Sequence, residues 1–129
     1  MAIKVGDRLP NATFRVTTAE GPNKPKTTDD IFRGKKVALF AVTGVNDAFV
    51  MEAWKKATGA TGKIEFLADG NGEFAKAVGM DFDGSGNGLG IRSKRYSMLV
   101  DDGVVKSLNI EDAPGKCDIS GGDALLKQL

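Results

Sequence analysis

Few residues of this chain are suited to covalent chemistry. The sequence contains no histidine and a single cysteine, Cys117. Without histidine, a Ser-His-Asp triad, a Cys-His pair and the usual zinc and non-haem iron sites are excluded. One cysteine cannot form an intramolecular disulfide, so any thiol chemistry must pass through Cys117 and be completed by an external thiol or a second subunit.

The surroundings of Cys117 in the sequence give opposing signals. Lys116 and the start of a final helix a few residues later would favour the thiolate, whereas Asp118 would oppose it. The pattern therefore favours an ordinary surface or half-buried thiol over a redox thiol.

A glycine-rich stretch, residues 80–90, invites two cofactor interpretations. Its glycines run G-x-G-x-G-x-G and precede a strand, which does not match the G-x-G-x-x-G of a dinucleotide site. Asp81, Asp83 and Ser85 match the first half of a calcium loop, but Arg92 stands where the bidentate glutamate belongs. We therefore expect a surface loop, with no metal and no cofactor.

The charges of the chain are balanced. Lys and Arg total 18 against 17 Asp and Glu, a formal charge of +1, and the two signs are interspersed. The small basic cluster of Arg92, Lys94 and Arg95 is typical of a solvated surface. This composition predicts neither a nucleic-acid partner nor a membrane partner. Because no apolar window is long enough for a leader or a span, we expect a cytoplasmic protein.

The elements that would position these residues follow from the apolar pattern. Residues 37–42 form the longest apolar run and predict a buried central strand, which leads into a helix over 48–57 capped by Asn46 or Asp47. Val50, Trp54 and Ala57 form the apolar face of that helix. The remaining elements are predicted as a strand at 12–16, a polar loop at 17–26, a threonine-capped helical turn at 27–32, a strand at 64–69, a helix at 71–78, a hairpin at 95–110 and a last helix at 121–129.

That last helix is predicted to begin at a Ser120 cap and to dock on the sheet through Leu125, Leu126 and Leu129. The alternation of strands and helices indicates an α/β fold. A length of 129 residues suits one domain, residues 1–129, with a single core.

Several stretches, taken in order, resemble type 5 (type II) peroxiredoxins of the bacterial kind. The resemblance covers nearly the whole chain and rests on residues 3–10, 34–40, 45–51 with Trp54, 67–74, 92–98, 102–106 and 114–117. It implies a thioredoxin-like fold with a central mixed sheet flanked by helices, and thiol-dependent reduction of hydrogen peroxide and alkyl hydroperoxides. In an active member it also implies a thiol reductant such as glutathione, glutaredoxin or thioredoxin. We expect a homodimer, because exposed strand edges and lost helix cover favour association.

The resemblance breaks directly after residue 40. In the family this strand is followed by a loop with P-x-x-x-T-x-x-C, a long helix and a further strand; here about thirty residues are absent, the size of the βα half of a crossover unit. The peroxidatic cysteine would lie in that segment, and Thr43 cannot replace the family threonine because Asn46 follows it at the cysteine spacing. Arg95 matches the family arginine that stabilises the thiolate and the peroxide. Cys117 matches a cysteine of some bacterial members, but not the attacking one.

The deletion has structural and functional consequences. Residues 35–45 would form one strand of about 36 Å, longer than an ordinary strand, with no crossover left. The sheet must lose a strand, or the long strand joins two subunits in a swapped dimer, or the physical protein contains a segment that this sequence lacks. We expect a peroxiredoxin-family protein with most or all of its peroxidase activity lost. The alternatives are a non-catalytic dimeric scaffold module and a residual one-cysteine peroxidase that uses Cys117.

Overall fold

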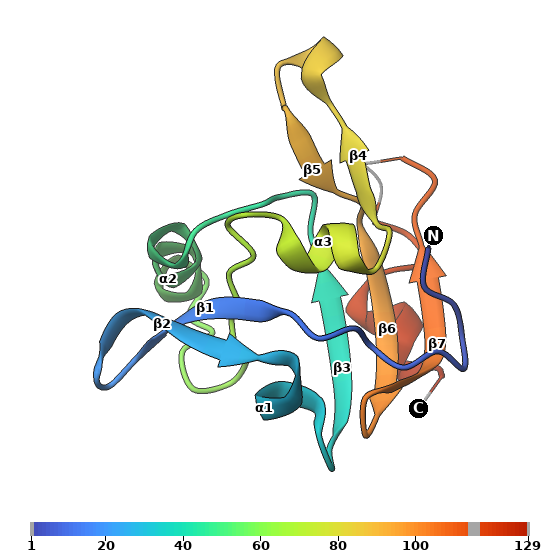
Figure 1. The fold of residues 1–129 in the computed structure, drawn as a ribbon, viewed down its shortest axis with the longest axis horizontal. Coiled ribbons are helices and arrows are strands. Elements are labelled where there is room, and N and C mark those ends of the chain that lie inside the picture. The colour runs from blue at the N-terminus through green and yellow to red at the C-terminus, as the bar shows by residue number, and fades with distance from the viewer. Residues whose placement is uncertain (1, 114–116, 129) are drawn as a thin grey trace.

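The main sheet of the molecule has three antiparallel strands in the order β3-β6-β7 (Figure 1). The computed structural model describes residues 2–113 and 117–128. The strands are β3 (Lys36–Ala41), β6 (Tyr96–Asp101) and β7 (Val104–Ile110). All strand pairs of the described residues are antiparallel, so the parallel strand that a mixed sheet requires is not formed among them.

The prediction that the apolar run forms the central strand is wrong. β3 lies at the edge of the sheet and pairs only with β6 among the described residues. Val37 and Leu39 pack against the core, whereas the side chain of Phe40 is 48% exposed. The strand ends at Ala41, and a tight turn follows in which the amide of Gly44 donates to the carbonyl of Val42 at 2.7 Å. The single long strand over 35–45 is therefore not formed.

The buried centre of the sheet is β6. Met98 and Val100 of β6 are fully buried, as is Val105 of β7. The predicted hairpin of β6 and β7 is confirmed, with Asp102 at φ 49° and Gly103 at φ 80° in its turn. These positive φ values suit the type I′ turn that matches the twist of two antiparallel strands.

The strand predicted at 12–16 is confirmed as β1 (Thr13–Thr18), whereas the two segments predicted as loops, 17–26 and 80–90, contribute strands to hairpins. β1 pairs with β2 (Gly21–Thr27), and β4 (Asp81–Asp83) pairs with β5 (Ile91–Ser93) across a 3₁₀ turn at Ser85–Asn87. β2 contains two prolines, which are rare inside sheets. It forms because β2 has one strand neighbour, so a proline without an amide proton interrupts no second ladder.

The described residues form α-helices that are short except for the second: α1 (Thr28–Phe32), α2 (Ala48–Ala57), α3 (Glu73–Ala77) and α4 (Gly122–Leu126). The threonine cap of α1 is confirmed, because the hydroxyl of Thr27 accepts from the amide of Asp30. Asp47 is the predicted cap of α2 and accepts from the amide of Val50 at 2.9 Å. No helix of the described residues is long and apolar enough to cross a membrane.

Two predictions near α4 and α3 are wrong. The N-cap of α4 is Gly121, not Ser120, because the backbone and hydroxyl of Ser120 are already bonded to the carboxylate of Glu111. Leu125 is buried, but Leu126 is 65% exposed, and residue 129 lies outside the described residues. The strand predicted at 64–69 is reduced to one bridge between Ala68 and Arg15, since no neighbouring parallel strand is present to pair with it.

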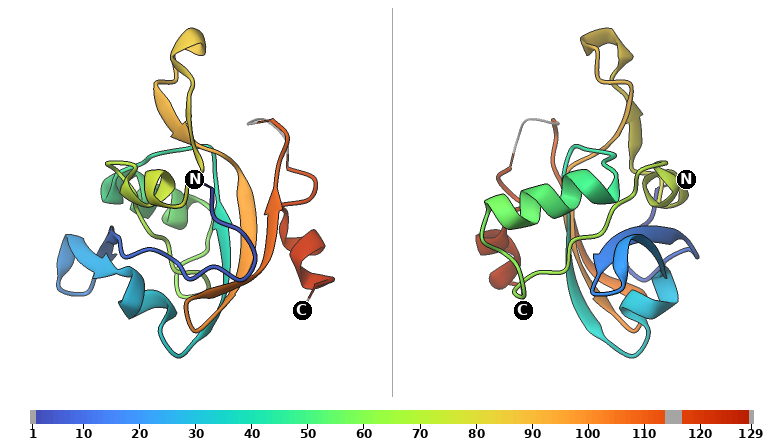
Figure 2. Two further views of the ribbon diagram at one scale, coloured as in Figure 1. Left: turned by 45° about the vertical axis from the view of Figure 1, so that its right-hand side comes forward. Right: turned by 90° about the vertical axis from the view of Figure 1, so that its left-hand side faces the viewer.

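The apolar face predicted on α2 is not covered. Val50 is 48% exposed and Trp54 is 42% exposed, and Ala57 is also exposed. Trp54 contacts the ring of Phe66 edge-on, with 5.2 Å between the ring centroids. As Figure 2 shows, α2 lies apart from β7 and α4, on the side of the molecule where β3 has no further strand. α2, with its exposed apolar side chains, thus lies on the side of the molecule where the sheet ends at β3.

Candidate functional site

Arg95 and the connection that follows β3 lie at one end of the main sheet. Ala41 at the end of β3 pairs with Tyr96 at the start of β6, and Tyr96 pairs with Ile110 at the end of β7. The connection from β3 to α2, residue Arg95 and the segment that begins at Glu111 therefore all start at this end. This end is taken as the candidate site because it holds Arg95 and the connection in which the resemblance breaks.

Arg95 lies immediately before β6, as predicted. Its side chain is half-buried, and its Nε atom is buried without a hydrogen-bond partner among the described residues. Its carbonyl accepts from the amide of Glu111 at 3.0 Å, which fixes its backbone to the end of β7. A buried donor without an acceptor is costly, and an anion or oxyanion bonded to the Nε atom would relieve that cost.

The connection between β3 and α2 contains no nucleophilic thiol. It runs over residues 42–47 and packs against the backbone around Gly70, where an added Cβ atom would lie 3.5 Å from the Cα atom of Asp47. The side chain of Asp47 is used as the helix cap of α2. This connection is therefore a short structural link without a nucleophilic thiol.

Cys117 is exposed, on the segment that follows β7. Glu111 holds this segment, because its carboxylate accepts from the Ser120 amide at 2.8 Å and from the Ser120 hydroxyl at 2.7 Å. These bonds, the hydroxyl bond above all, lower the pKa of the Glu111 carboxyl below its ordinary value. Lys116, which was predicted to act on the thiol, lies outside the described residues. Glu111 thus connects the segment of Cys117 to Arg95.

Tyr96 is buried and Asp69 is half-buried, and the sequence singled out neither of them for chemistry. Burial, and secondarily the negative charge of Asp69, raises the pKa of Tyr96 well above its ordinary value. The carboxylate of Asp69 accepts from the amides of Phe74 and Ala75, both at 2.9 Å, and so caps α3 in place of the N-cap residue Gly72. Tyr96 is therefore not suited to proton transfer near neutral pH, and Asp69 serves as the cap of α3.

The glycine-rich stretch forms the β4–β5 hairpin, which projects from the rest of the molecule (Figure 1). Asp83 accepts from the amide of Ser85 at 2.9 Å, and hydrogen bonds from Ser85 lower the pKa of its carboxyl. Arg92 closes the same loop by donating from Nε to the carbonyl of Leu89 at 2.6 Å. In the described part of the chain, no three metal-ligating side chains lie together.

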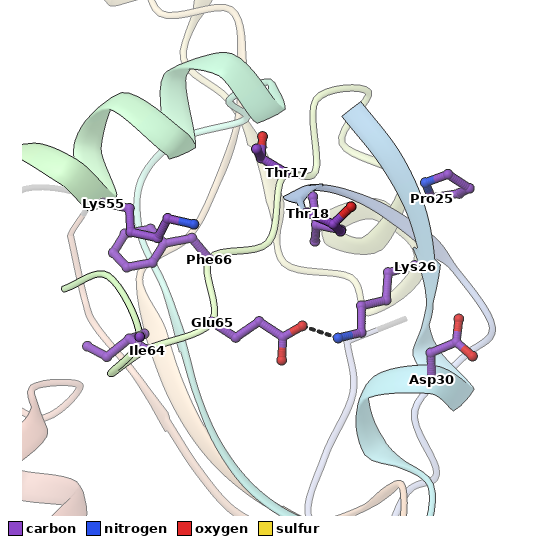
Figure 3. Close-up of a pocket in the computed structure, with 11 residues that line it drawn as sticks. Thr17, Thr18, Pro25, Lys26, Asp30, Lys55, Ile64, Glu65 and Phe66 are labelled. Carbon is purple, nitrogen blue, oxygen red and sulfur yellow. Dashed lines mark hydrogen bonds and ion pairs between the residues drawn. The ribbon is translucent and has the colours of Figure 1, made fainter. Parts of the chain in front are cut away.

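A cavity of about 330 Å³ opens between the β1–β2 hairpin and residues 62–66 (Figure 3). An ion pair between Lys26 and Glu65 crosses it. Neither Arg95 nor Cys117 lines this cavity, so it does not bring the predicted site residues together.

Comparisons with known proteins point to one family. The Redoxin family model matches residues 41–126. Peroxiredoxin-2E, chloroplastic, from Arabidopsis thaliana is 37% identical over 164 positions, covering 99% of this chain and 70% of the relative. Peroxiredoxin sll1621 from Synechocystis is 36% identical over 170 positions, covering 95% of this chain and 89% of the relative. Both alignments are longer than the 129 residues of the chain, so part of each relative has no counterpart here.

Solved structures agree with these relatives. A protein described as a putative thioredoxin reductase from Burkholderia cenocepacia superimposes with a TM-score of 0.93 at 34% identity, covering 100% of this chain and 99% of the other. Reduced Prx3 from Vibrio vulnificus, in complex with H₂O₂, superimposes with a TM-score of 0.90 at 37% identity, covering 98% of both chains.

Proposed function

This chain belongs to the redoxin family and, within it, to the type 5 (type II) peroxiredoxins, and we propose that it is a member without an efficient peroxide-reducing site. The predicted thioredoxin-like fold is confirmed by the same relatives. The proposal concerns the chemistry that this particular chain retains.

One observation carries the proposal: the end of the sheet that holds Arg95 contains no thiol in the connection that follows β3. Peroxide reduction needs a thiolate that attacks one peroxide oxygen, becomes a sulfenic acid and releases the other oxygen as an alcohol or water. Arg95 is placed to stabilise negative charge in such a step, and its Nε atom has no partner among the described residues. An arginine alone supplies no electron pair, so a bound peroxide would remain unreduced.

The length of the alignments supports the same proposal. They extend over 164 and 170 positions although the chain has 129 residues, and the Redoxin match begins at residue 41, at the end of β3. A segment absent between β3 and α2 would account for both observations. It would also account for the missing strand and for the exposed apolar face of α2.

A residual one-cysteine peroxidase is the second candidate, because Glu111 connects the segment of Cys117 to Arg95. In that reaction the Cys117 thiolate would attack the peroxide and form a sulfenic acid. Two equivalents of an external thiol, such as glutathione, or one dithiol of a glutaredoxin or thioredoxin would then regenerate the thiol and release water. The exposure of Cys117 makes slow reaction of this kind available to it even without an active site.

A non-catalytic role would use the surface instead. We propose that the chain is a homodimer in the cytoplasm, because a sheet with an uncovered edge and a helix with an uncovered apolar face favour association. In that role neither Arg95 nor Cys117 would matter for function.

Peroxide consumption by two variants separates these functions. We expect Arg95→Ala to leave the rate of hydrogen peroxide consumption unchanged within about twofold, since no thiolate depends on the guanidinium. Cys117→Ser should remove only a slow background rate of peroxide consumption, which the unfolded wild-type protein also shows. A loss of more than tenfold in Arg95→Ala would demonstrate a functioning active site and would overturn the proposal.

A further inference from the structure

The two edges of the main sheet differ in their cover. Residues 3–9 run along β7. The amide of Gly6 donates to the carbonyl of Val105 at 2.8 Å, and the amide of Val105 donates to the carbonyl of Asp7 at 2.9 Å. The amide of Leu9 donates to the carbonyl of Gly103 at 2.8 Å. On the other edge, no backbone bond from a described residue reaches the side of β3 that faces away from β6. One edge is therefore closed and the other is open.

The register shows which residues of β3 present their backbone to the open edge. The amide of Asp102 donates to the carbonyl of Lys35 at 2.9 Å, and residue 36 pairs with residue 101. Hydrogen-bonded pairs alternate along an antiparallel ladder, so odd-numbered residues of β3 bond to β6. Lys36, Ala38 and Phe40 then direct their N–H and C=O groups toward the open edge.

The same three residues are the exposed residues of β3, which alternates between exposed and half-buried positions. The middle residue is a small alanine, and Phe40 carries an aromatic ring that is 48% exposed. Edge strands are usually protected by charged side chains, by proline or by a bulge. β3 carries charge only at its lysine end and exposes an aromatic ring at the other end. It is suited to pairing with another strand.

We propose that β3 pairs with β3 of a second copy of this chain, antiparallel, with Ala38 opposite Ala38. This inference rests on the proposed homodimer and assigns its interface. A two-fold axis at Ala38 pairs Lys36 with Phe40 of the second copy, and so gives partners to all three outward residues of both strands. The result is a continuous six-stranded sheet in the order β7-β6-β3-β3-β6-β7.

Charge favours this arrangement over a parallel pairing. Lys35 and Lys36 stand at the same end of β3, so parallel strands would bring four ammonium groups together. The antiparallel arrangement places them at opposite ends and brings each Lys36 beside an exposed Phe40 ring, where a cation is attracted to the ring face. The interface is isologous, because each copy contributes the same strand.

The proposal is tested with two variants that place opposite charges at the same position, Ala38→Lys and Ala38→Glu. Wild-type protein should elute as a species of twice 13.6 kDa at micromolar concentration. Ala38→Lys and Ala38→Glu each place two like charges directly opposite one another, so each should weaken the dimer at least tenfold and elute as a monomer. An equimolar mixture of the two variants should recover the dimer. Ala19→Lys and Ala19→Glu, in the exposed turn between β1 and β2, are the matched controls and should remain dimeric.

Each outcome decides one part of the proposal. A wild-type monomer would overturn both the dimer and this interface. A wild-type dimer that survives in Ala38→Lys and Ala38→Glu would keep the dimer and overturn the β3 interface. Recovery in the mixture excludes misfolding as the cause of dissociation, whereas variants that stay monomeric when mixed contradict the proposed pairing.

Discussion

β3 and β6 are neighbours in one sheet and similarly apolar in sequence, yet they are buried to very different extents. Met98 and Val100 of β6 are fully buried, whereas Phe40 of β3 is 48% exposed. β6 has a strand on each side, and β3 has a strand on one side only. The difference shows that the neighbours a strand has, more than its own apolarity, decide how much of it is removed from water.

The same contrast extends to the segments that follow the strands. After β7, the carboxylate of Glu111 fixes the chain through Ser120, and Leu125 of α4 is buried. After β3, the chain turns at Gly44 and leads to α2, whose Trp54 is 42% exposed. The β6–β7 side is thus a completed half of the fold, and the β3–α2 side is an incomplete half.

The largest expected effect compares core truncations on the two sides. Met98→Ala removes a fully buried side chain, and we expect a loss of about 3 kcal/mol in the free energy of unfolding. Phe40→Ala truncates a half-exposed ring at the edge, and we expect a loss of about 1 kcal/mol or less. Urea unfolding of both variants, at a concentration where the protein is monomeric, measures the difference. Equal losses would show that β3 is buried as deeply as β6.

A smaller effect is expected from the caps of α3 and α2. Asp69→Ala removes the acceptor of two amides beside buried Tyr96, and we expect a cost of about 2 kcal/mol. Asp47→Ala removes one acceptor from exposed α2, at a cost of about 1 kcal/mol or less. Thermal or urea unfolding with a helix-sensitive signal measures both costs. If Asp47→Ala proved the more damaging, α2 would be better anchored than its exposure indicates.

The smallest effect concerns pH. The pKa of Glu111 is lowered in the folded state below its ordinary value of 4.5, so its carboxylate stabilises the fold fully above that value and progressively less as the pH falls through the lowered pKa. Glu111→Gln should therefore be less stable than wild type at pH 7, and the difference should shrink under acid conditions. Unfolding curves at a series of pH values measure it. A difference that did not change with pH would assign the role of Glu111 to packing.

The sequence predicted best those elements whose determinants are local. The β6–β7 hairpin follows from its Asp-Asp-Gly turn, and the start of α2 follows from the Asp47 cap. The capping of α3 by Asp69 was not predicted, because its carboxylate comes from outside the helix and its partners are set by tertiary structure. The central position of residues 37–42 was predicted wrongly, since apolarity does not reveal that a neighbouring strand is absent.

Of the candidate site, the position of Arg95 at the head of β6 could be predicted through the family resemblance. Its unpartnered Nε atom could not be predicted, because the lack of a partner depends on which groups the fold brings near. The link from Arg95 through Glu111 to Ser120 depends on strand register and was also not visible in the sequence. Cys117 was predicted as a surface thiol and is exposed.

The central claim is that the chain has no peroxidatic site, and the intact mass of the purified protein before and after one equivalent of hydrogen peroxide tests it most directly. We predict a starting mass near 13.6 kDa, and no faster oxygen addition or disulfide-dimer formation at Cys117 in folded protein than in urea-unfolded protein. A starting mass well above 13.6 kDa, or oxidation of the folded protein many times faster than the unfolded protein, would contradict the account.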